Sequence, residues 1–275
     1  MTTTTDTTGP GKASRYALSN DDPLGVNRLS QLPLILDEHS QGFLTDQGIA
    51  PGWKCLDVGP GAGTMTAWMA ELVGPRGQVT AIDIDPQHMK TLPGNVTVHT
   101  ADIRTVPLPP DHYDLVHARL VELHLAEREA VLHRLMTALK PGRPLVISDW
   151  DATWQDWLLH TPTQAGADAF HAFQNGLRAI LEESGADVSW ARRVPLVMRK
   201  AGLVDIDTVM HNRLWKGGSA GCLLHVTNAE QLRDQLLERG VTAEQLEQLR
   251  EAMHHLDTWA YSYLMYSTVG FRPEQ

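Results

Sequence analysis

A chain of 275 residues, of which 42% are hydrophobic, is long enough to bury a full core. Its net charge of −10 argues against nucleic acid as a partner, because phosphate binding requires a concentrated basic surface. No apolar run reaches membrane-spanning length and the threonine-rich start lacks a signal-peptide core, so we expect a cytoplasmic protein without a membrane partner. The two cysteines, Cys55 and Cys222, imply no disulfide framework and fit a reducing compartment.

The N-terminal region divides into a tail and a helical cap. Residues 1–15 are polar and unpatterned, so we expect a disordered tail there. Residues 16–50 are expected to form a helical cap, because Asp22 and Pro23 give a helix-start signal. Apolar residues then recur at helical spacing, and Pro33 should bend the helix.

Residues 55–63 form the most informative segment, a short apolar strand that runs into three glycines. Gly59, Gly61 and Gly63 permit a tight turn and close approach of a ligand to the backbone, before a helix that begins near Thr64. Their even spacing departs from a dinucleotide fingerprint, in which a glycine would replace Thr64. Asp57 would repel a pyrophosphate but attract an ammonium or sulfonium group, and S-adenosylmethionine (SAM) has those charges.

The next segments continue an alternation of strands and helices. Strands are predicted at 78–83 and 96–102, and each ends in an acid. Asp83 is suited to accept both ribose hydroxyls, and Asp102 the adenine amino group. A fourth strand is predicted over 113–119, a helix over 127–139 and a fifth strand over 145–148.

This order of motifs resembles the class I SAM-dependent methyltransferases, particularly the bacterial ubiquinone/menaquinone-biosynthesis and antibiotic-tailoring branch. The resemblance covers roughly residues 50–150 and implies an α/β fold, with a doubly wound, mostly parallel, seven-stranded Rossmann-like sheet and a SAM-binding core at 51–150. The cofactor-binding residues that it implies are Tyr16, Arg28, Asp57, Gly59, Gly61, Gly63, Asp83, Ile84, Asp102, Ile103, Ala118 and Arg119. The chain departs from the usual pattern at Pro60, where Cys or Gly is common, and at Arg143, which replaces a glycine.

Beyond residue 150 the sequence leaves the shared core. An insertion at 151–186 should contain a helix over 163–184, and 187–275 should complete the core with a helix at 189–201, a strand at 204–210 and an antiparallel last strand at 261–271. Two capping boxes, starting at Thr227 and Thr242, predict helices at 228–239 and 243–257 within a second insertion at 216–257. We expect the two insertions to pack together as a lid above the strand ends.

The residues that carry the chemistry are less clearly marked. His124, just beyond the fourth strand, is the first candidate for a general base, and Asp149 is the next; the alternatives are a structural histidine and a capping aspartate. Methyl transfer can also proceed by positioning alone. The tryptophans that could line an acceptor pocket, rather than only fill the core, are Trp150, Trp154, Trp157 and Trp215. The lid histidines His160, His171, His211 and His225 show no metal-ligand spacing with an acid or cysteine, so no metal is predicted.

The favoured function is a methyltransferase that acts on a small, fairly apolar metabolite in specialised metabolism. One alternative is a SAM-binding enzyme that catalyses a reaction other than methylation, such as a cyclisation. A peptide-modifying methyltransferase and a nicotinamide-dependent oxidoreductase are further alternatives, the last disfavoured by Asp57 and Thr64. A homodimer is compatible with the sequence.

Overall fold

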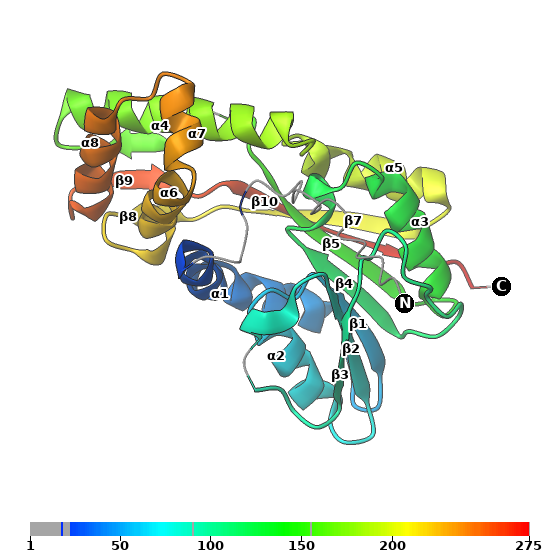
Figure 1. Ribbon diagram of the computed structural model, residues 1–275. Helices are drawn as coiled ribbons and strands as arrows, with labels where there is room; N and C mark the ends of the chain where they lie inside the picture. Colours follow the sequence, from blue (N-terminus) through cyan, green and yellow to red (C-terminus); the bar gives the residue numbers. More distant parts are fainter. Residues whose placement is uncertain (1–17, 19–22, 90, 155, 275) are drawn as a thin grey trace, which may run out of the picture.

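A seven-stranded sheet forms the centre of the molecule in the computed structural model, which describes residues 18, 23–89, 91–154 and 156–274 (Figure 1). The strand order is β3-β2-β1-β4-β5-β10-β7. The strands are β1 (Lys54–Val58), β2 (Gln78–Asp83), β3 (Val96–Thr100), β4 (Leu115–Arg119), β5 (Pro144–Asp151), β7 (Val204–His211) and β10 (Leu264–Phe271). β10 is antiparallel to both β5 and β7, while β1 to β5 pair in parallel, which confirms the predicted fold class.

Helices cover both faces of the sheet. Side chains of α1 (Pro23–Asp46) and α2 (Thr64–Val73) share a core with one face, and those of α3 (Arg128–Ala138) and α5 (Val194–Ala201) share a core with the other. Alternation along β4 divides its residues between these faces: Val116 and Ala118 pack on the α3 side, so His117 and Arg119 point to the α1 side. Among the described helices, none is long and apolar enough to cross a bilayer.

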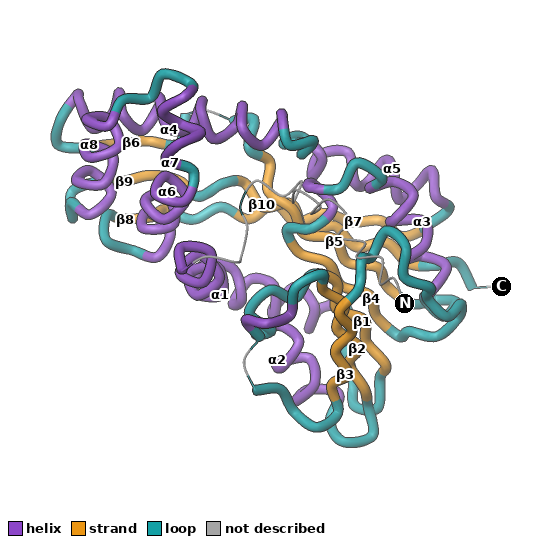
Figure 2. Tube along the Cα trace, viewed as in Figure 1, coloured by secondary structure: helices purple, strands orange, loops and turns teal. Residues whose placement is uncertain are grey.

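Helices and a small second sheet gather at one end of the molecule (Figure 2). The helices are α4 (Gln164–Glu183), α6 (Ala220–Gln231), α7 (Arg233–Glu238) and α8 (Ala243–His254). The small antiparallel sheet has the order β6-β9-β8, from Leu158–His160, Trp259–Tyr261 and Leu214–Lys216. Phe170, Phe173 and Leu249 are among the buried residues of their shared core, so segments 151–186 and 216–257 do pack together.

The capping box predicted at Thr227 is wrong. Thr227 lies inside α6, which begins at Ala220, and its hydroxyl donates to the Leu223 carbonyl oxygen at 3.1 Å. A buried threonine can bond the preceding turn in this way, so the sequence pattern alone does not mark a helix start. The capping box at Thr242 is confirmed, because its hydroxyl accepts the Gln245 backbone N–H and the Gln245 side chain accepts the Thr242 N–H.

Other boundaries differ by a few residues. The helix predicted over 189–201 starts as the 3₁₀ turn η3 (Trp190–Arg193), and the strand predicted over 261–271 divides between β9 and β10. The last predicted helix ends at His254 rather than 257. The unusual Arg143 stacks on Trp53, with its guanidinium 4.5 Å from the ring centroid, and does not line the large cavity described next.

Candidate functional site

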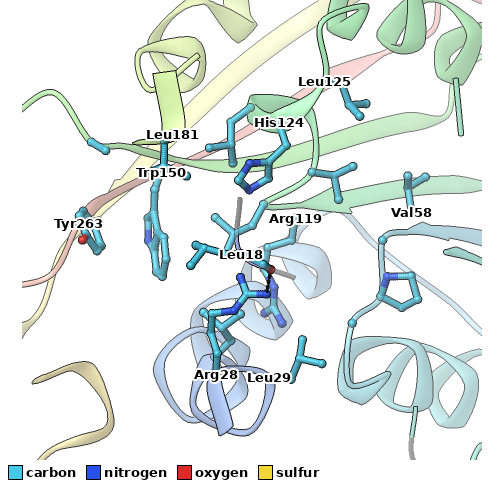
Figure 3. Close-up of a pocket in the computed structure, with 18 of the residues that line it drawn as sticks. Leu18, Arg28, Leu29, Val58, Arg119, His124, Leu125, Trp150, Leu181 and Tyr263 are labelled. Carbon is cyan, nitrogen blue, oxygen red and sulfur yellow. Dashed lines mark hydrogen bonds between the residues drawn. The ribbon is translucent and has the colours of Figure 1, made fainter. Parts of the chain in front are cut away.

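A cavity of about 810 Å³ lies between the carboxyl ends of the parallel strands and the helices of the lid segments. Its core side is formed by residues that follow β1, β2 and β4, and its lid side by residues of α4, α6 and the segment before β10. Figure 3 shows Val58 on one side of this space, Trp150 and Tyr263 on the other, and His124 opposite Arg28. A volume of this size is in the range of small-molecule and cofactor sites.

The glycine loop after β1 forms part of the core side. Gly59, Gly61 and Gly63 have φ angles of 62°, 58° and 77°, a left-handed region that side chains other than glycine rarely adopt. A Cβ atom at Gly59 would also collide with the side chain of Val121, which belongs to the loop after β4. Gly59 and Gly61 line the cavity. Gly63, the residue directly before α2, instead faces the side chains of Met89 and Leu92. Gly63 therefore shapes the turn without bordering the cavity.

Asp57 lines the cavity, but its carboxylate is already engaged by two neighbours. Its Oδ2 accepts the Thr66 hydroxyl at 2.6 Å, and its Oδ1 lies 2.8 Å from His117 Nδ1. Asp57 and His117 are direct neighbours across β1 and β4, and both are buried. Asp57 thus ties β1 to α2 and β4, and the sequence analysis missed His117 because the two residues are 60 positions apart.

Asp83 is joined to the glycine loop through the backbone. Its Oδ2 accepts the Gly61 N–H at 3.3 Å and its Oδ1 accepts the Asp85 N–H at 2.9 Å. Burial raises the pKa of this carboxyl group, while the two backbone N–H groups oppose the shift. A carboxylate has about four lone-pair positions, so Asp83 can still accept hydrogen bonds from a ligand.

The other expected cofactor residues after β2 and β3 also line the cavity. Ile84 is 64% exposed there, and Ile103 is buried. Asp102 lines the cavity two residues beyond the end of β3 and forms a two-point ion pair with Arg104, which donates from Nε to Oδ1 at 3.0 Å and from Nη2 to Oδ2 at 2.7 Å. Any ligand amino group at Asp102 would therefore share the carboxylate with this arginine.

Two arginines line the cavity on the α1 side. Arg28 is buried and donates to the Leu18 carbonyl oxygen at 2.6 Å. Arg119 donates to Asp37 at 2.9 Å and to Ser40 at 3.0 Å, which fastens β4 to α1. Ala118 does not line the cavity, because strand alternation points it into the core against α3. Tyr16 lies outside the described residues.

The two candidate bases are placed very differently. His124 lines the cavity on the 3₁₀ turn η2 (Glu122–His124). Burial and, to a lesser extent, the positive charges of Arg28 and Arg128 together lower its pKa to about 3, so the imidazole is neutral and a weak base. Asp149 is fully buried inside β5 and does not line the cavity. It instead lies close enough to the buried Glu122 for each to affect the other's ionisation.

Three of the four expected tryptophans, Trp150, Trp154 and Trp157, line the cavity. Trp215 does not, because its ring packs against Gly221 and lies 5.5 Å, centroid to centroid, from the His225 ring in the lid core. The sequence analysis missed further lining residues on the lid side, among them Gln174, Asn228 and Tyr263. A signal was present on α4, since His171, Gln174, Asn175, Arg178 and Leu181 recur at helical spacing.

Comparison with known proteins agrees with this geometry. Residues 55–142 match the family model described as a methyltransferase domain. The chain is 30% identical over 154 residues to the ubiquinone/menaquinone biosynthesis C-methyltransferase UbiE of Shewanella sediminis, covering 52% of this chain and 58% of that protein. The chain therefore spans little more than half the length of the curated relatives that it matches.

Solved structures share the fold at low sequence identity. Phosphoethanolamine N-methyltransferase 2 of Haemonchus contortus, in complex with SAM, has a TM-score of 0.59 at 15% identity, covering 96% of this chain and 61% of that chain. A putative methyltransferase of Bacillus halodurans C-125 has a TM-score of 0.55 at 14% identity, covering 85% and 98%. Residues 55–142 thus match a methyltransferase domain, and the seven-stranded sheet agrees with the fold that the resemblance to class I SAM-dependent methyltransferases implied.

Proposed function

We propose that this protein binds SAM at the core side of the cavity and transfers its methyl group to a small, largely apolar acceptor at the lid side. The observation that carries the proposal is one continuous cavity that joins the glycine loop and Asp83 to the aromatic side chains Trp150 and Tyr263. The relatives are named as C-methyltransferases of ubiquinone and menaquinone biosynthesis, so one candidate acceptor is a quinone-type ring that is methylated at carbon. We further propose that the protein acts in specialised metabolism and is located in the cytoplasm.

The residues on the core side fit SAM chemically. Asp83 retains lone pairs for ribose hydroxyls, and Ile84 and Ile103 offer apolar surface to an adenine ring. The acids among the described lining residues are Asp57, Asp83, Asp85 and Asp102, all on the core side, which favours a cationic ligand there. Arg28 supplies positive charge for a carboxylate, and Arg119 lines the same side although it also pairs with Asp37, so both ends of a methionine moiety have complementary groups.

The proposed reaction uses positioning more than proton transfer. When bound, SAM supplies an electrophilic methyl group. Walls from α4, α6 and the turn η2 enclose the acceptor, exclude water and fix its direction of approach. His124 is neutral and can orient a hydroxyl or amine by hydrogen bonding, but its low pKa makes it a poor proton acceptor.

Isothermal titration with SAM, S-adenosylhomocysteine (SAH) and NADH tests the cofactor assignment directly. We expect SAM and SAH to bind and NADH not to bind. Mass spectrometry of candidate acceptors incubated with methyl-labelled SAM then tests transfer, with formation of SAH as the second readout. A folded protein that binds neither SAM nor SAH would overturn the proposal, and tight NADH binding would favour the oxidoreductase alternative.

A further inference from the structure

Two amide side chains and a tyrosine form a polar patch on the lid side of the cavity. Gln174 of α4, Asn228 of α6 and Tyr263 all line the cavity. Tyr263 donates its hydroxyl to Gln174 Oε1 at 3.0 Å, and Gln174 Nε2 lies 3.2 Å from Nδ1 of the fully buried His225. Through these two contacts the Gln174 side chain connects α4, α6 and the segment before β10.

The neighbours of Gln174 fix the direction of its amide. Burial raises the pKa of the Tyr263 hydroxyl, so Tyr263 keeps its proton and donates it. Burial lowers the pKa of His225 to about 3, so its ring is neutral and its Nδ1 accepts from Gln174 Nε2. The amide is left with one lone pair on Oε1 and one N–H for a ligand in the cavity.

Asn228 gives an independent indication of a ligand. It is 5% exposed, it lines the cavity, and its Oδ1 has no hydrogen-bond partner within the described part of the chain. It lies one helical turn from His225 on α6, on the side that faces the cavity. A buried acceptor without a donor costs about 1–3 kcal/mol, and a ligand that donates to Asn228 would remove that cost.

The aromatic and charged side chains around this patch indicate the shape and charge of the ligand. The ring centroids of Trp150 and Tyr263 are 5.0 Å apart, and Trp157 meets Tyr263 edge-on at 4.1 Å. Trp150 and Trp157 also line the cavity, and such rings favour a flat apolar body. Among the described lining residues of α4 and α6 there is no acid, while Arg178 and His171 are present. No carboxylate of these two helices is therefore available in the cavity to pair with an ammonium group.

We propose that Gln174 and Asn228 determine acceptor specificity by selecting an uncharged aromatic molecule that carries a hydrogen-bond donor, such as a phenolic hydroxyl. This inference rests on the proposed methyltransferase function and names the substrate class of the same cavity. An analogue without the donor leaves the Asn228 oxygen unpaired and the second lone pair of the Gln174 oxygen unused, so a polar site rejects it more strongly than an apolar site would. Gln174 and Asn228 bind and orient the acceptor and take no part in bond making.

A matched pair of probes tests the selection. Protein saturated with SAH is dialysed to equilibrium against 2-naphthol or 2-methoxynaphthalene, which share one ring system but differ in the O–H donor. We expect wild type to bind 2-naphthol at least about tenfold more tightly, the equivalent of one hydrogen bond. Gln174→Met and Asn228→Leu remove the polar atoms at similar volume, and each should reduce the preference to below about threefold.

Asn175→Leu is the control, because Asn175 follows Gln174 on α4 and lines the same cavity but is exposed. It should keep the wild-type preference. SAH affinity reports folding, and Asn228→Ala replaces Asn228→Leu if leucine disturbs α6. Four results would overturn this inference. Wild type could bind the two probes equally or bind neither of them. It could bind 2-naphthylmethylammonium more tightly than 2-naphthol, or the Gln174 and Asn228 variants could keep the full preference. Absence of SAH binding would instead overturn the proposed function.

Discussion

Glu122→Gln should stabilise the protein above pH 7, because wild type buries two carboxyl groups together. Glu122 and Asp149 are both 0% exposed, and within the described chain none of their four oxygens has a partner in ordinary hydrogen-bond geometry. Burial raises the pKa of Glu122 from 4.5 to about 7. Burial also raises the pKa of Asp149, and the charge of Glu122 raises it further, while the backbone N–H groups of Leu123 and Val121 and the charge of Arg128 oppose the shift.

The magnitude follows from the shift in the pKa of Glu122. Between pH 4.5 and about 7 the folded protein keeps a proton that the unfolded chain has released, so the free energy of unfolding falls as pH rises through this window. A shift from 4.5 to about 7 corresponds to roughly 3 kcal/mol at pH 8 and to almost nothing at pH 4. Glutamine has no proton to lose, and its amide can donate to Asp149. The melting temperature of Glu122→Gln should therefore exceed that of wild type by roughly 5–10 °C at pH 8.

Calorimetry of wild type and Glu122→Gln at pH 4.5 and pH 8 measures this difference. Glu129→Gln is the control, because Glu129 is exposed on the neighbouring helix α3. It should change the melting temperature little at either pH. The two carboxyl groups titrate as a pair, so Asp149→Asn should give a related gain. If Glu122→Gln is no more stable than wild type at pH 8, the carboxyl pair is solvated or paired in solution and the reasoning fails.

Three further substitutions test the core side of the cavity. Asp83→Ala should weaken SAM binding by roughly ten- to a hundredfold, and unchanged affinity in a titration of the folded variant would remove Asp83 from the site. Gly59→Ala should cost roughly 1–3 kcal/mol more stability in denaturant unfolding than Gly48→Ala, because both glycines have positive φ but only Gly59 faces a side chain that its Cβ would strike. His117→Ala should lose roughly 1–3 kcal/mol by leaving the buried Asp57 short of a partner, and a wild-type melting temperature would contradict this.

Local sequence signals predicted the parts of the fold that depend on neighbouring residues. The start expected for the helix after the glycine loop, near Thr64, agrees with α2, and the bounds expected for the second strand, 78–83, agree with β2. Glycines at fixed spacing and an acid after an apolar run identify that region without any knowledge of distant contacts. The same signals singled out Asp57 and Asp83, and both residues line the cavity.

Contacts between distant segments could not be predicted in this way. The pair Asp57–His117 depends on which strand adjoins β1, and the Gln174 network joins α4, α6 and the segment before β10. The small sheet is made of three-residue strands, which are too short to show alternation. Trp215 illustrates the same limit, since a tryptophan in a lid can face either the cavity or the lid core.

A substitution of His124 distinguishes between two roles for this residue, orienting the acceptor and acting as a general base. Burial and the charges of Arg28 and Arg128 hold its pKa at about 3, so the imidazole is neutral throughout pH 5–8. His124 takes up no proton in that range. A fall in kcat/KM at low pH caused by His124 is therefore not expected, and the pH profiles of wild type and His124→Ala should have the same shape. Loss of a hydrogen bond that only orients the acceptor should lower turnover by less than about tenfold, against a hundred- to ten-thousandfold for a lost base. Transfer of labelled methyl groups, measured from pH 5 to pH 8 in wild type and His124→Ala at saturating SAM, separates the two. An acidic limb near pH 6.5 in wild type that is absent from His124→Ala would establish His124 as the base, and would mean that a bound ligand offsets the effects of burial and of the two arginine charges.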